Sequence, residues 1–318
     1  MSKEAEPAGG EKYRRLIAAA QGQTKIKAAV VHPCDEVSLR GAVEAHKLGL
    51  IEPILVAPSP RVRNAADEAH LDVSGFELVE SAHSHESAAK AVGLVTAGRV
   101  EALMKGSLHT DELMGAVVTR EGGIRTARRI SHCFIMDVPG HPEPLIITDA
   151  AVNITPDLDA KVDIIQNAID LAHAMGALEV RVAILSAMET VTAKVPSTIE
   201  AAALCKMAER GQITGALLDG PLALDNAISP EAAAIKKIAS PVAGRANVLV
   251  VPDLEAGNML AKSLSFLANA DAAGIVLGAR VPIILTSRAD SLLSRLASCA
   301  VAVMVAAARR KAAASPIH

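Results

Sequence analysis

Three short segments combine hydroxyl, basic and acidic side chains at points where an apolar run gives way to a helical pattern. The first contains Lys105, Gly106, Ser107 and Thr110 and follows the apolar run 102–104. Free backbone N–H groups and the positive end of a helix meet at such a junction, so an anion is favoured there. Gly106 permits a close backbone approach, and the lysine and threonine add donors. We predict a phosphate-binding turn, with a capped turn and a solvated lysine as the alternative. The Gly-x-x-x-x-Gly-Lys order of a P-loop is absent.

The second segment runs from Thr286 to Ser291 and places Ser287, Arg288 and Asp290 at another helix start. A hydroxyl, a guanidinium and a carboxylate this close together suffice to bind phosphate and to move a proton. The alternative makes Asp290 or Ser291 a helix N-cap and Arg288 a surface residue.

The third segment, 251–258, brings Asp253, Gly257 and Asn258 to a further helix start. Acidic residues are common in first helical turns, so Asp253 alone proves little. A glycine there costs about 1 kcal/mol relative to alanine, which indicates close approach of a ligand or of another helix. We predict that these three residues bind substrate.

Four further residues are weaker candidates for substrate binding. Asp149 and Asn153 follow the apolar run 144–148, and a turn bonded to its own backbone is the alternative. The pair Arg128 and Arg129 forms either an exposed cluster or a clamp for phosphate groups.

The elements that would position these segments follow an alternating pattern. Apolar runs alternate with helical patterns, which is typical of a parallel sheet covered by helices; the first such runs are 28–31, 53–56, 77–79 and 102–104. Two runs around the turn-rich segment 139–142 predict a hairpin or a crossing between domains. Because the alternation then restarts, we predict two α/β domains, residues 1–148 and residues 149–286, and the final segment 287–318 is long enough to return to the first domain. The apolar stretch 296–308 is too short to span a bilayer and predicts a buried helix.

The composition excludes several classes of protein. The 318 residues are 51% apolar and 21% charged, which is ample for two domains with large cores. The net charge of -3 and the scattered basic residues predict no nucleic-acid partner. The four cysteines lie far apart with no metal-type spacing, so we predict no metal site and a reduced, cytoplasmic setting. No membrane partner is predicted.

Three segments in order along the chain resemble the phosphate acetyltransferase and phosphate butyryltransferase family. They are 241–248, 251–258 and 282–291, and the resemblance extends from Lys25 to Ala308. The sequence of residues 286–291 resembles the butyryltransferases more than the acetyltransferases.

The resemblance implies two α/β domains with an interdomain cleft, a fold shared with isocitrate and isopropylmalate dehydrogenases, and a homodimer. It further implies reversible transfer of a short acyl group, acetyl or butyryl, between coenzyme A and phosphate. Coenzyme A is then a substrate, and no tightly bound cofactor is expected. Ser287 and Arg288 would bind substrate and stabilise the transition state. Acetyl-specific members place a catalytic aspartate seven residues after that serine, where this chain has Ser294, so Asp290 is the alternative base.

Two other functions remain open at this point. An NAD-dependent decarboxylating dehydrogenase would share the implied fold, and fold does not fix function. A coenzyme A-binding protein without catalysis would explain the serine at position 294.

Overall fold

The computed structural model describes residues 10–287 and 290–314 of the chain. These residues form two compact units. The first, here called the N-terminal unit, comprises the described residues of 13–128 and 273–314, and the second, the central unit, comprises 10–12 and 129–272. The sequence placed the changes of domain at 148/149 and 286/287, whereas the compact units change over at 128/129 and 272/273.

The N-terminal unit is built on strands in the order β3-β2-β1-β4-β11-β10. The strands are β1 (Ile26–Val31), β2 (Ile51–Ala57), β3 (Glu77–Glu80), β4 (Ala102–Lys105), β11 (Ile283–Ile284) and β10 (Asp271–Leu277), whose first residues belong to the central unit. All neighbours from β3 to β11 are parallel, with Val31 opposite Lys105 and Ile284 opposite Met104. Only β10 runs antiparallel to β11.

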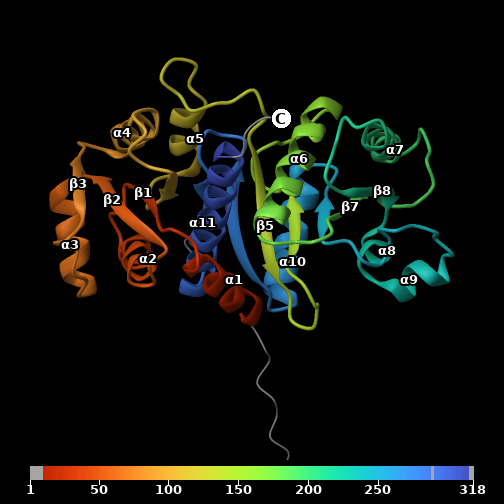
Figure 1. Ribbon diagram of the computed structural model, residues 1–318, viewed down its shortest axis with the longest axis horizontal. Helices are drawn as coiled ribbons and strands as arrows, with labels where there is room; N and C mark the ends of the chain where they lie inside the picture. Colours follow the sequence, from red (N-terminus) through yellow and green to blue (C-terminus); the bar gives the residue numbers. More distant parts are fainter. Residues whose placement is uncertain (1–9, 288–289, 315–318) are drawn as a thin grey trace, which may run out of the picture. The chain divides into compact units, whose positions relative to one another are not determined.

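Helices cover both faces of these strands. They are α1 (Glu11–Gln21), α2 (Glu36–Lys47), α3 (Ser59–Ala69), α4 (Ser84–Thr96), α5 (Thr110–Val118) and α11 (Leu292–Ala314). Figure 1 shows α4 on the opposite side of β1 and β2 from α2 and α3, and α4 packs against α5 and β1.

The last helix, α11, is long and contains a continuous apolar stretch. By length and composition α11 could cross a membrane, but 67% of its apolar window is buried in the structure. It packs against α2 and β11, and every residue from Ser294 to Val303 is buried. The prediction of a buried helix in this stretch is confirmed.

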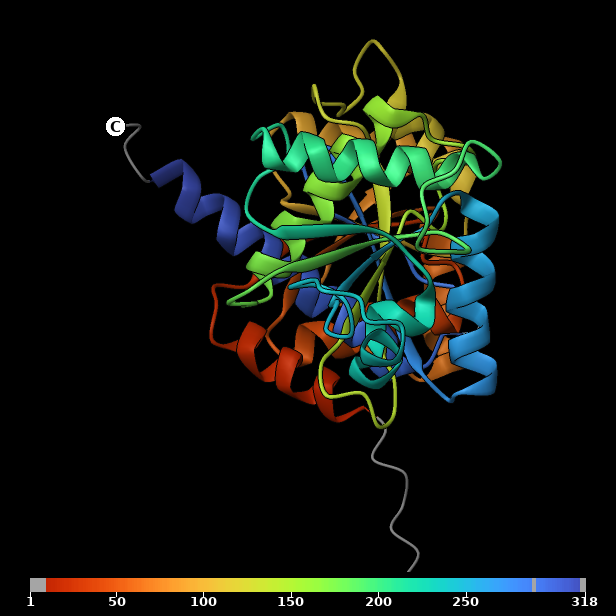
Figure 2. The same cartoon turned by 90° about the vertical axis from the view of Figure 1, so that its right-hand side faces the viewer.

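The central unit has strands in the order β5-β6-β9-β7-β8. The strands are β5 (Ser131–Asp137), β6 (Leu145–Thr148), β7 (Arg181–Leu185), β8 (Leu217–Leu222) and β9 (Val248–Val250), and the helices are α6 (Leu158–Ala174), α7 (Pro196–Glu209), α8 (Leu224–Ile228), α9 (Pro230–Ile235) and α10 (Leu254–Leu267). Figure 2 shows α7 on one side of β7 and β8, with α8 and α9 on the other.

The hairpin alternative for the turn at 139–142 is confirmed, whereas a second antiparallel pair was not predicted. Strands β5 and β6 form an antiparallel hairpin, and β10 and β11 form a second antiparallel pair. Both connections are too short for the helical crossover that parallel neighbours require. Gly140, with φ of 80°, turns the first of them. Because β6 pairs with β9, the hairpin belongs to the central unit.

Candidate active site

Three adjacent parallel strands of the N-terminal unit end at one edge, and two of the predicted segments follow them. The turn at Gly106 follows β4, and Thr286 and Ser287 follow β11, which pairs directly with β4. The segment after β1, from His32 to Asp35, lies on the other side of β4. The structure therefore brings the phosphate-turn candidate and the Ser287 segment together at the carboxyl edge of β4 and β11, where ligands of open α/β sheets commonly bind.

The turn after β4 is held tightly against the end of β1. The N–H of Gly106 donates to Val31 O at 2.9 Å, and Ser107 donates to His32 O from its N–H at 3.0 Å and its Oγ at 2.8 Å. A Cβ on Gly106 would lie 2.4 Å from Val31 O. Glycine is thus required by the approach of two chain segments, whatever ligand the turn binds.

The lysine of this turn is buried. Lys105 is 7% exposed and its Nζ lies 3.4 Å from Gly106 O. A buried ammonium needs negative charge nearby, and the charge of Lys105 acts on the Asp290 carboxylate.

The start of α5 is already served by a carboxylate. Glu112 Oε2 accepts the N–H of His109 at 2.8 Å, and its Oε1 accepts Ser84 Oγ at 2.6 Å. The hydrogen bond from Ser84 is the main cause that lowers the pKa of Glu112. Thr110 is exposed at this helix start. The positive end of α5 is therefore already balanced by Glu112 of the same helix. The turn at 105–107 is the better site for an anion.

Asp290 and Ser287 form a closed local loop. Ser287 N–H donates to Asp290 Oδ2 at 2.6 Å, and Asp290 N–H donates to Ser287 O at 3.3 Å. Burial is the largest effect and raises the pKa of Asp290 above its ordinary value, while the Ser287 bond and the charges of Arg295 and Lys105 lower it. A carboxylate with a raised pKa is a stronger base. Arg288 lies outside the described residues.

One residue of this edge was not predicted from the sequence. Arg295, on the first turns of α11, donates from Nη1 to Thr286 Oγ1 at 2.8 Å and from Nη2 to Ser287 O. The signal that could have revealed it is a single arginine within the otherwise uncharged stretch Ser294–Val303.

The central unit gathers the remaining candidates around the loop after β6. Asp149 is 3% exposed, and its carboxylate accepts the N–H groups of Ala151, Val152 and Asn153 at 3.0 to 3.1 Å. Asn153 Nδ2 donates to the same carboxylate at 2.5 Å. These bonds give Asp149 a clear role in shaping the loop.

Arg129 is tied to this loop, whereas Arg128 belongs to the other unit. Arg129 Nε donates to Asn153 Oδ1 at 2.7 Å, and its backbone N–H donates to Asp163 Oδ2 at 2.7 Å. Its side chain is exposed. Arg128 is half-buried, and its backbone N–H donates to Thr126 Oγ1 at 3.1 Å. The two neighbouring arginines thus belong to different compact units.

The start of α10 packs directly on the loop after β6. Asp253 is the N-cap and accepts the N–H of Ala256 at 2.8 Å. A Cβ on Gly257 would lie 2.9 Å from the Cβ of Ala150, so this glycine permits close packing of helix on loop. Asn258 Nδ2 lies 3.4 Å from Ala150 O.

His132 on β5 is a buried titratable group that the sequence did not single out as a site residue. It is 1% exposed, and its Nδ1 has no hydrogen-bond partner among the residues that the structure describes. Burial lowers the pKa of His132 to about 4, and the charge of Asp149 acts in the opposite direction. The neutral ring is therefore the form that the core accommodates.

Comparison with known proteins assigns the chain to a family. The family model described as phosphate acetyl/butaryl transferase matches residues 83–303. The phosphate acetyltransferase of Rhizobium meliloti is 68% identical over 96% of this chain and 97% of its own length. The phosphate butyryltransferase of Clostridium acetobutylicum is 37% identical over 92% of this chain and 98% of its own length. The relatives thus include proteins named for the acetyl reaction and proteins named for the butyryl reaction.

Solved structures correct the fold that the sequence led us to expect. A branched-chain phosphotransacylase from Enterococcus faecalis V583 has a TM-score of 0.77 at 29% identity, covering 88% of this chain and 99% of that one. A phosphotransacetylase from Streptococcus pyogenes, with a TM-score of 0.80 at 24% identity over 92% of this chain and 98% of that one, shares the fold. The isocitrate and isopropylmalate dehydrogenase-like fold is therefore wrong. The chain has the phosphotransacylase fold with its mixed strands, and it belongs to the phosphate acetyl/butyryl transferase family.

Proposed function

We propose that this chain transfers an acyl group reversibly between coenzyme A and inorganic phosphate, with acetyl as the preferred group. Family membership supports the reaction, and the 68% identity to a protein named phosphate acetyltransferase supports acetyl. The observation that carries the proposal in the structure is the carboxyl edge of β4 and β11. There a buried lysine, a tight glycine turn and a serine–aspartate loop follow adjacent strands.

In the direction that consumes acyl phosphate, Asp290 is proposed to act as the base. It takes the proton of the coenzyme A thiol, whose ordinary pKa of about 8.5 needs only modest help at neutral pH. The thiolate attacks the acyl carbonyl, a C–S bond forms, the C–O bond to phosphate breaks, and phosphate leaves with the bond's electron pair. The proton on Asp290 returns to phosphate, so no covalent enzyme intermediate is needed.

Charge that develops on the carbonyl and phosphate oxygens would be stabilised by Ser287 and by Arg288. A well-placed donor of this kind contributes roughly 3 kcal/mol to transition-state stabilisation. Lys105, Gly106, Ser107 and Thr110 are proposed to hold the phosphate group. The first three are favoured because the α5 start is compensated by Glu112.

The residues of the central unit are proposed to serve the rest of the substrate. Exposed Arg129, oriented by Asn153, would bind phosphate groups of coenzyme A. Asp149, Asp253, Gly257 and Asn258 would act by shaping the loop after β6 and the start of α10.

We further propose that the enzyme is cytoplasmic, holds no tightly bound cofactor and forms a homodimer. The surface proposed for the second copy is the outer side of α10. There Met259, Phe266 and Leu267 are 63%, 79% and 84% exposed. Large apolar side chains this exposed on one helix are typical of an interface.

An acyl panel tests the proposed function. Purified protein is mixed with coenzyme A and acetyl, propionyl or butyryl phosphate, and thioester formation is followed by its absorbance. We expect turnover with all three and the highest kcat/KM with acetyl phosphate, with about 10-fold or more between the extremes. Tight coenzyme A binding without thioester from any acyl phosphate would instead support the non-catalytic alternative.

A further inference from the structure

Arg295 is a charged residue in an apolar environment. It lies on α11 within the buried stretch Ser294–Val303 and is 4% exposed. Taking a guanidinium out of water is costly unless its donors are paired and an opposite charge is near. Its retention at this depth therefore requires a specific set of partners.

The partners lie on the strand end of the candidate site. Nη1 donates to Thr286 Oγ1 at 2.8 Å, and Nη2 donates to the backbone oxygen of Ser287. The planar guanidinium thus spans two successive residues after β11. Its Nε has no partner within the described part of the chain.

The packing of α2 leaves room for this side chain. A Cβ on Gly41 would lie 3.4 Å from Arg295 Cδ and 3.3 Å from Met104 Cε. Gly41 is itself buried on α2. The aliphatic stem of Arg295 therefore fits between α2 and β4, and the guanidinium is directed to the strand end.

Several charged groups surround the pair formed by Arg295 and Asp290. Both residues line a pocket of about 100 Å³ with Val37, Leu292 and two charged side chains of α2. The titratable or charged groups around the pair are Asp35, Glu36, Arg40, Lys105 and Cys299.

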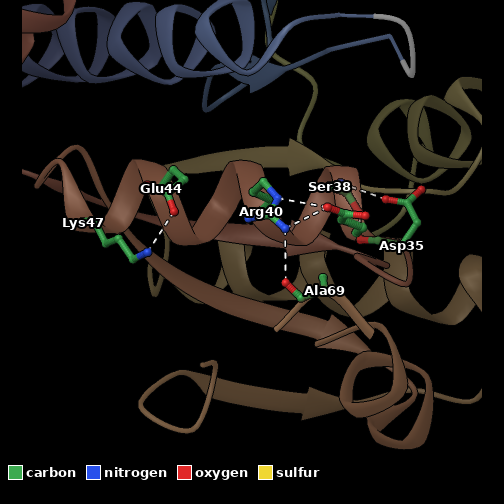
Figure 3. Close-up of polar contacts among 7 residues, drawn as sticks. Asp35, Ser38, Arg40, Glu44, Lys47 and Ala69 are labelled. Atoms are coloured by element: carbon green, nitrogen blue, oxygen red, sulfur yellow. Dashed lines mark hydrogen bonds and ion pairs between the residues drawn. The ribbon is translucent and has the colours of Figure 1, made fainter. Parts of the chain in front are cut away.

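The other arginine of this pocket is already engaged. Arg40 Nη2 donates to Glu36 Oε1 at 2.7 Å and to Ala69 O at 3.1 Å, and Figure 3 shows its side chain reaching Ala69. Asp35 caps α2 by accepting the N–H of Ser38 at 2.8 Å, also drawn in Figure 3. Of the two arginines that line this pocket, Arg295 is the one that binds the Thr286–Ser287 strand end.

We propose that Arg295 is a positioning residue for acyl transfer, which fixes the Thr286–Ser287 strand end and holds a positive charge beside Asp290. This inference rests on the proposed function. Through the backbone oxygen of Ser287, Arg295 orients the serine whose N–H binds Asp290. The charge of Arg295 lowers the pKa of Asp290 against the effect of burial and so tunes the base.

The test compares R295M and R295K with R310M in the full chain. Arg310 lies on the same helix and pairs with Glu101 at 2.7 Å at the surface, so R310M removes an equivalent side chain away from the site. With acetyl phosphate and coenzyme A, we expect R295M to lower kcat about 100-fold, because a misplaced reacting group carries a penalty of that size. KM should change much less.

The pH profile distinguishes positioning from a purely structural role. In R295M the acid limb of kcat/KM should move to higher pH, because Asp290 loses the cation that lowers its pKa. R295K keeps the positive charge, so the acid limb of kcat/KM should return to its wild-type position. Its kcat should stay low, because an ammonium does not reproduce the bidentate hydrogen bonding of the guanidinium.

The outcomes separate this inference from the proposed function. A wild-type protein without thioester formation would refute the proposed function. An active wild type with R295M equal to R310M in kcat and pH profile would overturn the role of Arg295. If R295M does not fold, R295K decides: wild-type kcat in R295K would equally overturn it.

Discussion

At the scale of the residue, Asp290 combines burial with a single strong backbone donor. Burial raises its pKa, and the N–H of Ser287 fixes its Oδ2 at 2.6 Å. The sequence predicted Asp290 by its place at a helix start, but its partner Arg295 was missed. An arginine in an apolar helix gives no spacing pattern, and only the fold shows that it faces the strand end.

Replacing Asp290 by Asn is expected to lower activity and to increase stability. Loss of the base should reduce kcat about 100-fold or more and remove the acid limb of the pH profile. The folded-state pKa of Asp290 is raised above 3.8, so the ionised carboxylate destabilises the fold. D290N should therefore have the higher Tm at pH 7, and the difference should vanish below pH 3.8. Wild-type kcat in D290N would contradict the assignment of the base.

His132 is expected to make the protein sensitive to mild acid. Its pKa falls from 6.5 to about 4 on folding, so its stabilising contribution is complete above pH 6.5 and is lost as the pH falls toward 4. The H132Q variant should show a smaller fall in the free energy of unfolding over that pH range. H141Q, at a partly exposed histidine of the same unit, serves as the control. An unchanged pH dependence in H132Q would count against this account.

At the scale of the element, hydrophobic alternation located most helices and strands of the fold. The apolar run 28–31 lies in β1 (Ile26–Val31), and the run 102–104 lies in β4 (Ala102–Lys105). Strand β10 (Asp271–Leu277) was missed, because its Asp-Ala-Ala-Gly start has low strand propensity. Its pairing with β11 is a tertiary interaction that a local pattern does not contain.

The turn after β4 offers a test of element geometry. G106A would place a Cβ 2.4 Å from Val31 O, so we expect a loss of about 1 to 3 kcal/mol in the free energy of unfolding, measured by urea denaturation. Activity should fall with it, because β1 and the turn would separate. G115A on α5 is the matched control, since the added methyl group would meet no described atom within 4 Å other than those of its chain neighbours and its own helical turns. Equal stability of the two variants would contradict the close approach at Gly106.

At the scale of the whole molecule, the sequence predicted two α/β units and a phosphate acyltransferase but assigned the wrong fold. The turn-rich segment 139–142 indicated the β5–β6 hairpin as one alternative, whereas no local signal indicated the antiparallel pair of β10 and β11. The direction of a strand depends on the length of the connection that precedes it and on the strand with which it pairs. Amino-acid composition specifies neither the length of a connection nor the pairing of the strands.

The exposed apolar side of α10 predicts a dimer in solution. F266E should convert the dimer to a monomer in light scattering, because a carboxylate would be buried at the interface. L178E changes another exposed leucine of the central unit and should leave the dimer intact. A monomeric wild type would refute the proposed surface.

The central claim is direct acyl transfer between phosphate and coenzyme A, and isotope exchange tests it most directly. Labelled inorganic phosphate is incubated with acetyl phosphate and the enzyme, with and without coenzyme A. The account predicts label in acetyl phosphate only when coenzyme A is present, because no acyl-enzyme forms. Exchange at the same rate without coenzyme A, or no exchange with it, would contradict the account.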